Sequence, residues 1–128
     1  MKAPDKWLLL VFGIIVWILG TLWYRMRGTI LLETTSFLFR CNFVLVPIFS
    51  AAVCILLLKV HHVPASDWSV AMLLIALPGM FGEALLLSHF TTFMPHLRAE
   101  SAGKYGALLF ASYALALTIA EAVTFRSR

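Results

Sequence analysis

Four long apolar segments constrain the fold of this chain more than any other feature. Each is roughly 20 residues long or longer and carries few formal charges, and about 20 apolar residues are what a helix needs to cross a hydrocarbon layer about 30 Å thick. A segment in lipid must satisfy its own backbone hydrogen bonds, which favours the α-helix. The sequence therefore predicts an all-α membrane protein, a four-transmembrane-helix bundle over residues 7–24, 35–60, 68–93 and 105–125.

The composition agrees with this prediction. Of the 128 residues, 62% are hydrophobic and 12% are charged, and the mean hydropathy is +0.94, which lies outside the usual balance of a soluble globular domain. The connections between the four segments are too short to form a soluble catalytic module. We therefore expect residues 1–128 to form a single integral membrane domain.

Helix-breaking residues lie inside two of the predicted spans. Pro47 interrupts the second span and Pro78-Gly79 interrupts the third, and an internal proline removes a backbone hydrogen bond. The sequence therefore predicts kinked helices 2 and 3. The apolar stretch 28–33, between the first two spans, is too short to cross and predicts an interfacial segment.

One carboxylate, Glu83, is the sole formal charge in the third span, and an acid within a membrane span is by default a candidate site that needs a partner. If the second and third spans form a hairpin that turns near residue 63, counting 1.5 Å per residue from their facing ends at Val60 and Trp68 puts Arg40 at roughly 30 Å and Glu83 at roughly 23 Å from the same face. An arginine side chain can bridge that difference, and Asn42 lies near enough to add an amide. The sequence predicts a buried polar cluster of Arg40, Asn42 and Glu83.

Three roles for Glu83 stay open at this stage. An ion pair with Arg40 would fix helix register, because breaking a buried pair is costly. A proton or substrate relay would use the same acid functionally. In the third, Glu83 is protonated or reaches a water-filled pocket.

Small residues recur every four positions in the fourth span, at Gly103, Ala107 and Ala111. Such spacing lets helix backbones approach closely in lipid. The stripe predicts helix packing, either within the chain or across a homodimer.

Patterns for catalysis or for holding a metal are weak. His61 and His62 are adjacent, so their side chains point about 100° apart on a helix and do not chelate one ion together. The serines lack a nucleophile elbow, and there is no phosphate-binding loop. We expect no catalytic residue, no cofactor, no metal and no nucleic-acid partner.

Part of the second half resembles a known family. The residues that carry the likeness are LPGMFGEALLL at 77–87, followed by FMP at 93–95 and AGKYGALL at 102–109 with Tyr113. Over about Leu77 to Leu117 the chain resembles an uncharacterised family of short bacterial membrane proteins with four predicted helices, a domain of unknown function. The resemblance implies a bacterial inner-membrane location and implies no activity.

Three function classes fit these features. The favoured one is a non-enzymatic membrane bundle with an accessory or hydrophobic-ligand-binding role. The others are a small dimeric transporter that uses Glu83 as its coupling acid, and an integral membrane enzyme acting on lipid. Lysines and arginines are balanced between the two faces, and the charges that flank the first span favour cytoplasmic termini. The expected partners are the lipid bilayer and a second copy or another membrane protein.

Overall fold

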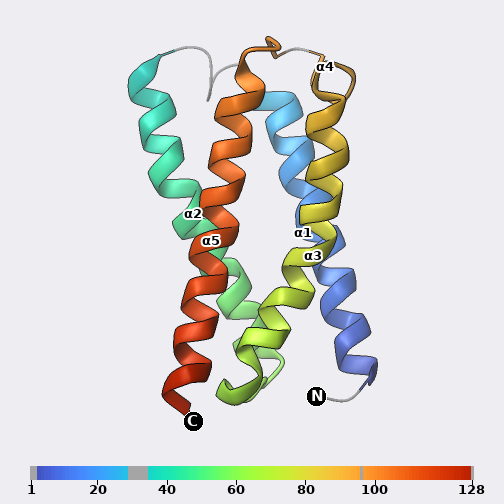
Figure 1. Cartoon of the computed structure of the whole chain (residues 1–128), viewed down its shortest axis with the longest axis vertical. Coiled ribbons are helices and arrows are strands. Elements are labelled where there is room, and N and C mark those ends of the chain that lie inside the picture. The colour runs from blue at the N-terminus through green and yellow to red at the C-terminus, as the bar shows by residue number, and fades with distance from the viewer. Residues whose placement is uncertain (1–2, 29–34, 96, 128) are drawn as a thin grey trace.

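The computed structural model describes residues 3–28, 35–95 and 97–127. Within these ranges all regular structure is helical, as Figure 1 shows. The elements are α1 (Ala3–Gly28), α2 (Ser36–Val60), the short 3-10 helix η2 (Ala65–Asp67), α3 (Trp68–Ser88), α4 (Phe90–Phe93) and α5 (Ser101–Ser127).

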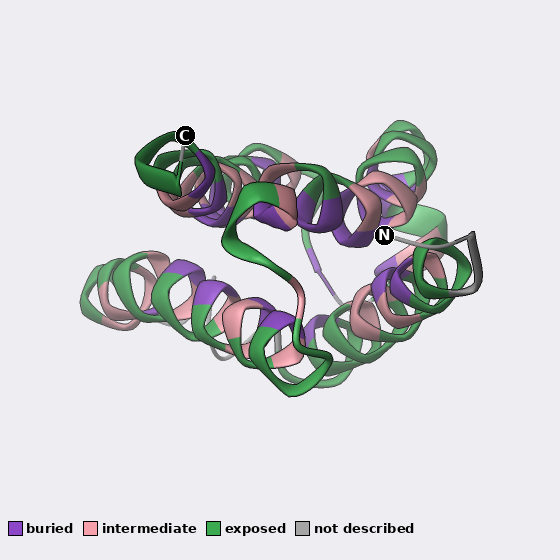
Figure 2. Ribbon diagram, turned by 90° about the horizontal axis from the view of Figure 1, so that it is seen from below, coloured by how far each residue is buried: buried purple, intermediate pink, exposed green. Residues whose placement is uncertain are grey.

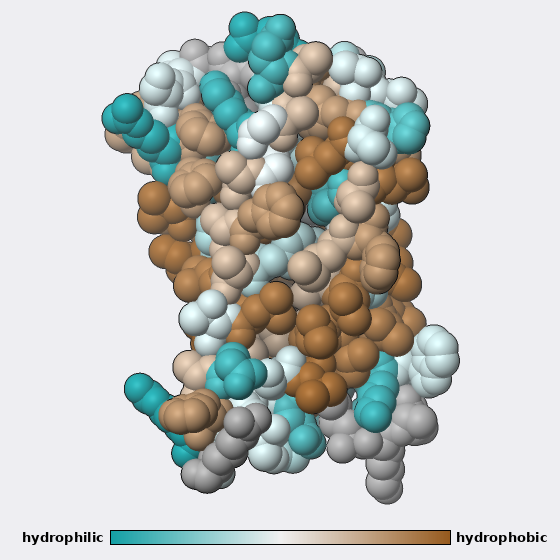
Figure 3. Space-filling view, in the orientation of Figure 1, coloured by the Kyte–Doolittle hydropathy of each residue, from teal (hydrophilic) through white to brown (hydrophobic). Residues whose placement is uncertain are grey.

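Four of these helices are long and apolar enough to cross a membrane: Asp5–Arg27, Ser36–Val60, Ala65–Ser88 and Ser101–Ser127. On the face shown in Figure 3, hydrophobic side chains predominate over the middle of the molecule, and most hydrophilic side chains gather towards its two ends. A bilayer requires this distribution, because its core is apolar and its two interfaces are wet. The predicted fold class, an all-α bundle of four membrane-spanning helices, is confirmed.

The helix ends differ from the predicted ones mainly at the third span. We expected it to continue to residue 93, but α3 ends at Ser88. His89 leaves the helical conformation at φ −131° and ψ 45°, and the single turn α4 follows it. The predicted span therefore consists of two helices joined at one non-helical residue.

The helices do not pack in chain order. α1 packs mainly on α3, α2 packs mainly on α5, and α3 and α5 pack on each other. The consecutive helices α1 and α2 thus have different partners, and buried positions face the space between the helices in the end-on view of Figure 2. Gly13 permits the close approach of α1 to α3, since a Cβ there would clash with the Ile75 carbonyl oxygen.

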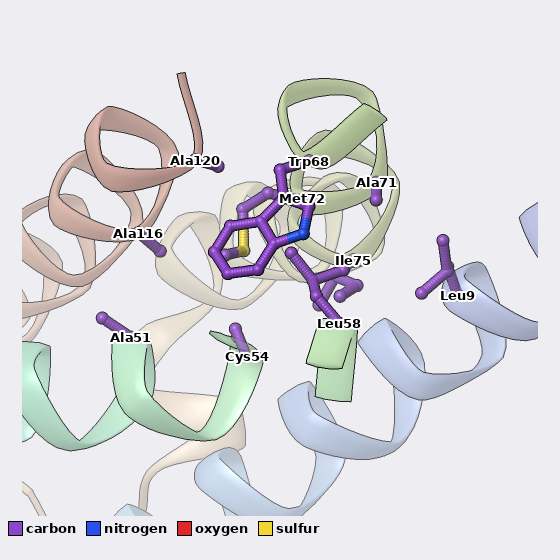
Figure 4. Close-up of a cluster of buried hydrophobic side chains, with 10 residues drawn as sticks. All are labelled: Leu9, Ala51, Cys54, Leu58, Trp68, Ala71, Met72, Ile75, Ala116 and Ala120. Atoms are coloured by element: carbon purple, nitrogen blue, oxygen red, sulfur yellow. The ribbon is translucent and has the colours of Figure 1, made fainter. Parts of the chain in front are cut away.

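Two clusters of buried side chains fill the bundle. The first draws on all four long helices, as Figure 4 shows. The second lies around the start of α5 and the end of α3. The first consists of Leu9, Ala51, Cys54, Leu58, Trp68, Ala71, Met72, Ile75, Ala116 and Ala120, and the second of Tyr24, Leu86, Phe90, Met94, Leu97, Tyr105 and Leu108.

The start of α3 is fixed by a residue from α5. Asp67 occupies the N-cap position, but its side chain makes no cap hydrogen bond. Instead Thr124 Oγ1 accepts a hydrogen bond from the Ser69 backbone N–H at 2.9 Å and donates one to the Ala65 carbonyl oxygen at 2.9 Å. Thr124 therefore satisfies one of the free N–H groups that every helix start leaves.

Both internal prolines lie within continuous helices, Pro47 in α2 and Pro78 in α3. The kinks predicted at these positions stay predictions. The interfacial segment predicted at 28–33 falls outside the described residues apart from Gly28, the last residue of α1.

Candidate functional site

Glu83 is buried within α3, about 22 Å from the start of that helix at 1.5 Å per residue. Only 5% of the residue is exposed. Its Oε1 accepts a hydrogen bond of 2.8 Å from the indole Nε1 of Trp17 in α1. Gly82 makes this contact possible, because a Cβ at that position would lie 2.5 Å from Trp17 Cε2.

The second carboxylate oxygen, Oε2, has no hydrogen-bond partner in the part of the chain that the structure describes. Two tyrosines of α5, Tyr105 and Tyr113, lie close enough to the carboxylate to interact with it electrostatically. The Tyr105 hydroxyl lies near both Glu83 and Thr21, although neither Glu83 Oε2 nor Thr21 Oγ1 makes a hydrogen bond of standard geometry to a described residue. Tyr113 also lies directly against α3, since a Cβ at Gly79 would clash with its hydroxyl oxygen. An ionised carboxylate is purely an acceptor, so Oε2 can still receive a hydrogen bond from a bound molecule.

The structure does not bring together the predicted cluster of Arg40, Asn42 and Glu83. Arg40 is on the exposed side of α2, whereas Glu83 bonds to Trp17. Asn42 is buried but pairs with Tyr24 of α1: the tyrosine hydroxyl donates to Asn42 Oδ1 at 3.0 Å and accepts from Nδ2 at 2.8 Å. The prediction rested on heights along two helices that an arginine side chain can bridge, and height does not fix the direction in which a side chain points.

A cavity of about 140 Å³ lies between the two buried clusters and borders Glu83. It takes residues from all four long helices. Gly20 lines the cavity and is itself exposed, with no atom within 4 Å of a Cβ built there, so the cavity reaches the lipid-facing surface beside α1. The remaining lining residues are Gly13, Val16, Trp17, Thr21, Tyr24, Val46, Ser50, Cys54, Met72, Ile75, Ala76, Gly79, Glu83, Tyr105, Leu109, Ser112, Tyr113 and Ala116.

The cavity has the chemical character of a small-molecule site. Its walls are mostly apolar, with a few polar atoms, which is typical of ligand pockets. An engineered protein cavity of about 150 Å³ binds benzene, so the space near Glu83 suits a group of that size. Within 3–28, 35–95 and 97–127, no group of three or more His, Cys, Asp or Glu side chains could hold a metal ion.

The stripe of small residues predicted for helix packing turns mostly outward. Gly103 and Ala107 are exposed and Ala111 is half-buried, and no atom lies within 4 Å of a Cβ built at Gly103. Inside the chain, α5 packs through a different face of small residues, which includes Ala116 and Ala120.

Sequence reasoning missed Trp17, Tyr24 and the two α5 tyrosines as parts of the site. Trp and Tyr are enriched where a helix leaves the membrane, and Tyr24 and Tyr105 lie close to the ends of predicted spans. Trp17 and Tyr113 lie well inside their spans. A hydrogen-bonding aromatic residue far from the interface needs a polar partner. The positions of Trp17 and Tyr113 deep within their spans could therefore have indicated a polar site.

Comparison with known proteins places the chain in a family. The model of a family of unknown function, DUF5367, matches residues 30–126. The chain belongs to this family. No curated protein and no solved structure matches it at a significant level. The match covers the second, third and fourth spans. It is longer than residues 77–117, the part of the chain over which the sequence resemblance is most specific.

Proposed function

We propose that this multi-pass membrane protein binds a small, mostly apolar molecule with a hydrogen-bond donor in the cavity between its two buried clusters. The observation that carries the proposal is the coincidence of a benzene-sized apolar space with Glu83, a buried acid with one unpartnered oxygen. Burying an unpaired polar group in an apolar environment is costly. A ligand that pairs with Oε2 would remove that cost and fill the cavity.

The open side of the cavity supports entry from the bilayer. Gly20 lies within a membrane-spanning helix and is exposed, so the opening beside it meets acyl chains. An apolar ligand concentrates in that phase. An ion pair between Arg40 and Glu83 would seal the carboxylate from a ligand. Glu83 instead borders the cavity, whereas Arg40 does not line it and is exposed.

Protein-observed NMR of the tryptophan indole N–H groups tests this proposal. Of the four tryptophans, Trp17 lines the cavity, whereas Trp7 and Trp23 are exposed and Trp68 lies in the first buried cluster. Addition of fluorobenzene to the protein in detergent should shift the Trp17 signal saturably. The signals of the exposed tryptophans report how fluorobenzene partitions into the detergent. The signal that disappears in the Trp17→Phe variant is that of Trp17.

Filling the cavity supplies a matched pair of variants. Ser50 of α2 lines the cavity and Ala52 of the same helix is exposed and does not line it. Ser50→Leu should abolish the shift of the Trp17 signal, and Ala52→Leu should leave it unchanged. Equal linear drift of the Trp7, Trp17 and Trp23 signals, with no saturation, would overturn the proposal.

The proposal also covers location. We propose a bacterial inner membrane with both chain ends in the cytoplasm, supported by the sequence resemblance and by the charges that flank the first span. In Figure 1, α1 begins and α5 ends at the same end of the bundle, as an even number of crossings requires.

A further inference from the structure

We propose that the cavity ligand carries a primary ammonium group, which binds between the Glu83 carboxylate and the aromatic side chains around it. The inference rests on the proposed function and names the chemical class of its ligand. Two unpartnered oxygens and the composition of the cavity wall lead to it.

Two buried oxygen atoms of the lining residues have no hydrogen-bond partner within the described ranges, Glu83 Oε2 and Thr21 Oγ1. The Glu83 residue is exposed over only 5% of its surface. An ionised carboxylate accepts only, and a threonine hydroxyl has two acceptor lone pairs. A primary ammonium presents three donors and no acceptor, so its donors match the accepting character of both oxygens, whose residues line the same cavity, whereas an alcohol has a single donor.

The charge of the cavity lining also favours a ligand with an ammonium group. Among its described lining residues Glu83 is acidic and none is lysine, arginine or histidine. A buried charge is tolerated when it is paired, and the indole N–H of Trp17 supplies a hydrogen bond without a positive charge. When Glu83 is ionised, a cationic ligand provides the missing charge.

Aromatic side chains complete the site. Trp17, Tyr24, Tyr105 and Tyr113 all line the cavity, and the rings of Tyr24 and Tyr105 meet edge to face with centroids 5.2 Å apart. Aromatic rings attract an ammonium electrostatically, most strongly where water is excluded, and cages of such rings recognise quaternary ammonium ligands. A cavity lined by one carboxylate, four aromatic residues and, among the described residues, no basic side chain therefore favours an amine over a neutral molecule of the same shape.

The test compares benzylamine with benzyl alcohol, which has nearly the same size and shape. At near-neutral pH, where the amine is protonated, both are titrated into the detergent-solubilised protein while the Trp17 indole signal is followed. We expect benzylamine to bind at least about tenfold more tightly than benzyl alcohol, the factor expected from a desolvated cation–π contact. This comparison uses the unmodified protein and does not depend on the folding of a variant.

Variants separate the amine preference from general binding. Glu83→Gln keeps an oxygen for the Trp17 indole and removes the charge, so it should abolish the preference while benzyl alcohol still binds. Glu121→Gln is the matched control, because Glu121 is an exposed carboxylate of α5 that bonds to Ser69; it should leave both affinities unchanged. Thr21→Val should weaken benzylamine more than benzyl alcohol.

The outcomes distinguish the two proposals. If fluorobenzene and benzyl alcohol bind and benzylamine binds no more tightly, the ammonium inference is overturned and the apolar-ligand function stands. A preference for benzylamine that survives Glu83→Gln overturns the inference as well. If none of the three probes shifts the Trp17 signal saturably, the proposed function fails and the inference fails with it.

Discussion

Replacing Gly82 with alanine should disconnect Trp17 from Glu83. The added methyl group would lie 2.5 Å from Trp17 Cε2 and 2.6 Å from Cζ2, whereas carbon atoms pack at about 3.5–4.0 Å. The indole must therefore move by about 1 Å. Its Nε1 lies 2.8 Å from Glu83 Oε1, so a shift of that size takes the contact beyond the upper limit of about 3.2 Å for a good N–H···O hydrogen bond.

The expected cost follows from three contributions. Overpacking a filled site costs about 1–3 kcal/mol, and a side-chain hydrogen bond inside a membrane protein contributes about 0.6 kcal/mol on average. Alanine is a better helix former than glycine by about 0.8–1.0 kcal/mol, which offsets part of the loss. We expect Gly82→Ala to lower the free energy of unfolding by about 1–2 kcal/mol.

Gly20→Ala is the matched control, because it also replaces a glycine inside a helix. No atom lies within 4 Å of a Cβ at Gly20, so this variant should lose no stability. Unfolding in mixed micelles of a denaturing detergent, followed by circular dichroism, compares the two. A Gly82→Ala protein as stable as Gly20→Ala, with an unchanged Trp17 indole signal, would refute the predicted contact between Trp17 and α3.

Three further outcomes follow from the described contacts. Thr124→Val removes the group that caps α3 and should lower the free energy of unfolding by about 1 kcal/mol. Thr118→Val, at an exposed position of α5, which also carries Thr124, should change it little. Equal effects of the two variants in unfolding titrations would contradict the capping role. Arg40→Gln and Glu83→Gln should have additive effects on the free energy of unfolding, because the two residues do not meet. A double-mutant cycle should give a coupling energy below about 0.5 kcal/mol. A coupling energy well above that value would show that they form an ion pair. Reporter fusions after the last residue and in the turn between α2 and α3 should report the same compartment, and opposite compartments would exclude four crossings.

The spans were predictable because the determinants are local. Each helix in a membrane satisfies its own backbone hydrogen bonds and each must be apolar over its own length, so hydropathy along the chain locates it. The end of α3 was not predictable in this way. His89 leaves the helix although apolar residues continue beyond it, and hydropathy does not register a change of backbone conformation.

The site was predictable in part. The isolated charge of Glu83 marked a polar locus, and the structure places this residue at a cavity. Its bonding partner was not predictable from charge, because the rotation of each helix about its own axis decides which side chains meet. Close packing at Gly13 and Gly82 brings α1 onto α3 and sets Trp17 against Glu83, and these contacts span distant parts of the chain.

A crystal of the protein in a lipid phase, pressurised with xenon, tests the intramembrane cavity most directly. Xenon occupies apolar protein cavities of about 150 Å³, and its anomalous scattering locates it without any assumption about the natural ligand. We expect a xenon site bordered by Trp17, Ala76, Glu83 and Tyr113, all of which line the cavity, and its loss in Ser50→Leu. A crystal in which side chains fill this space and xenon binds only at the lipid-facing surface would contradict the existence of a binding cavity at Glu83.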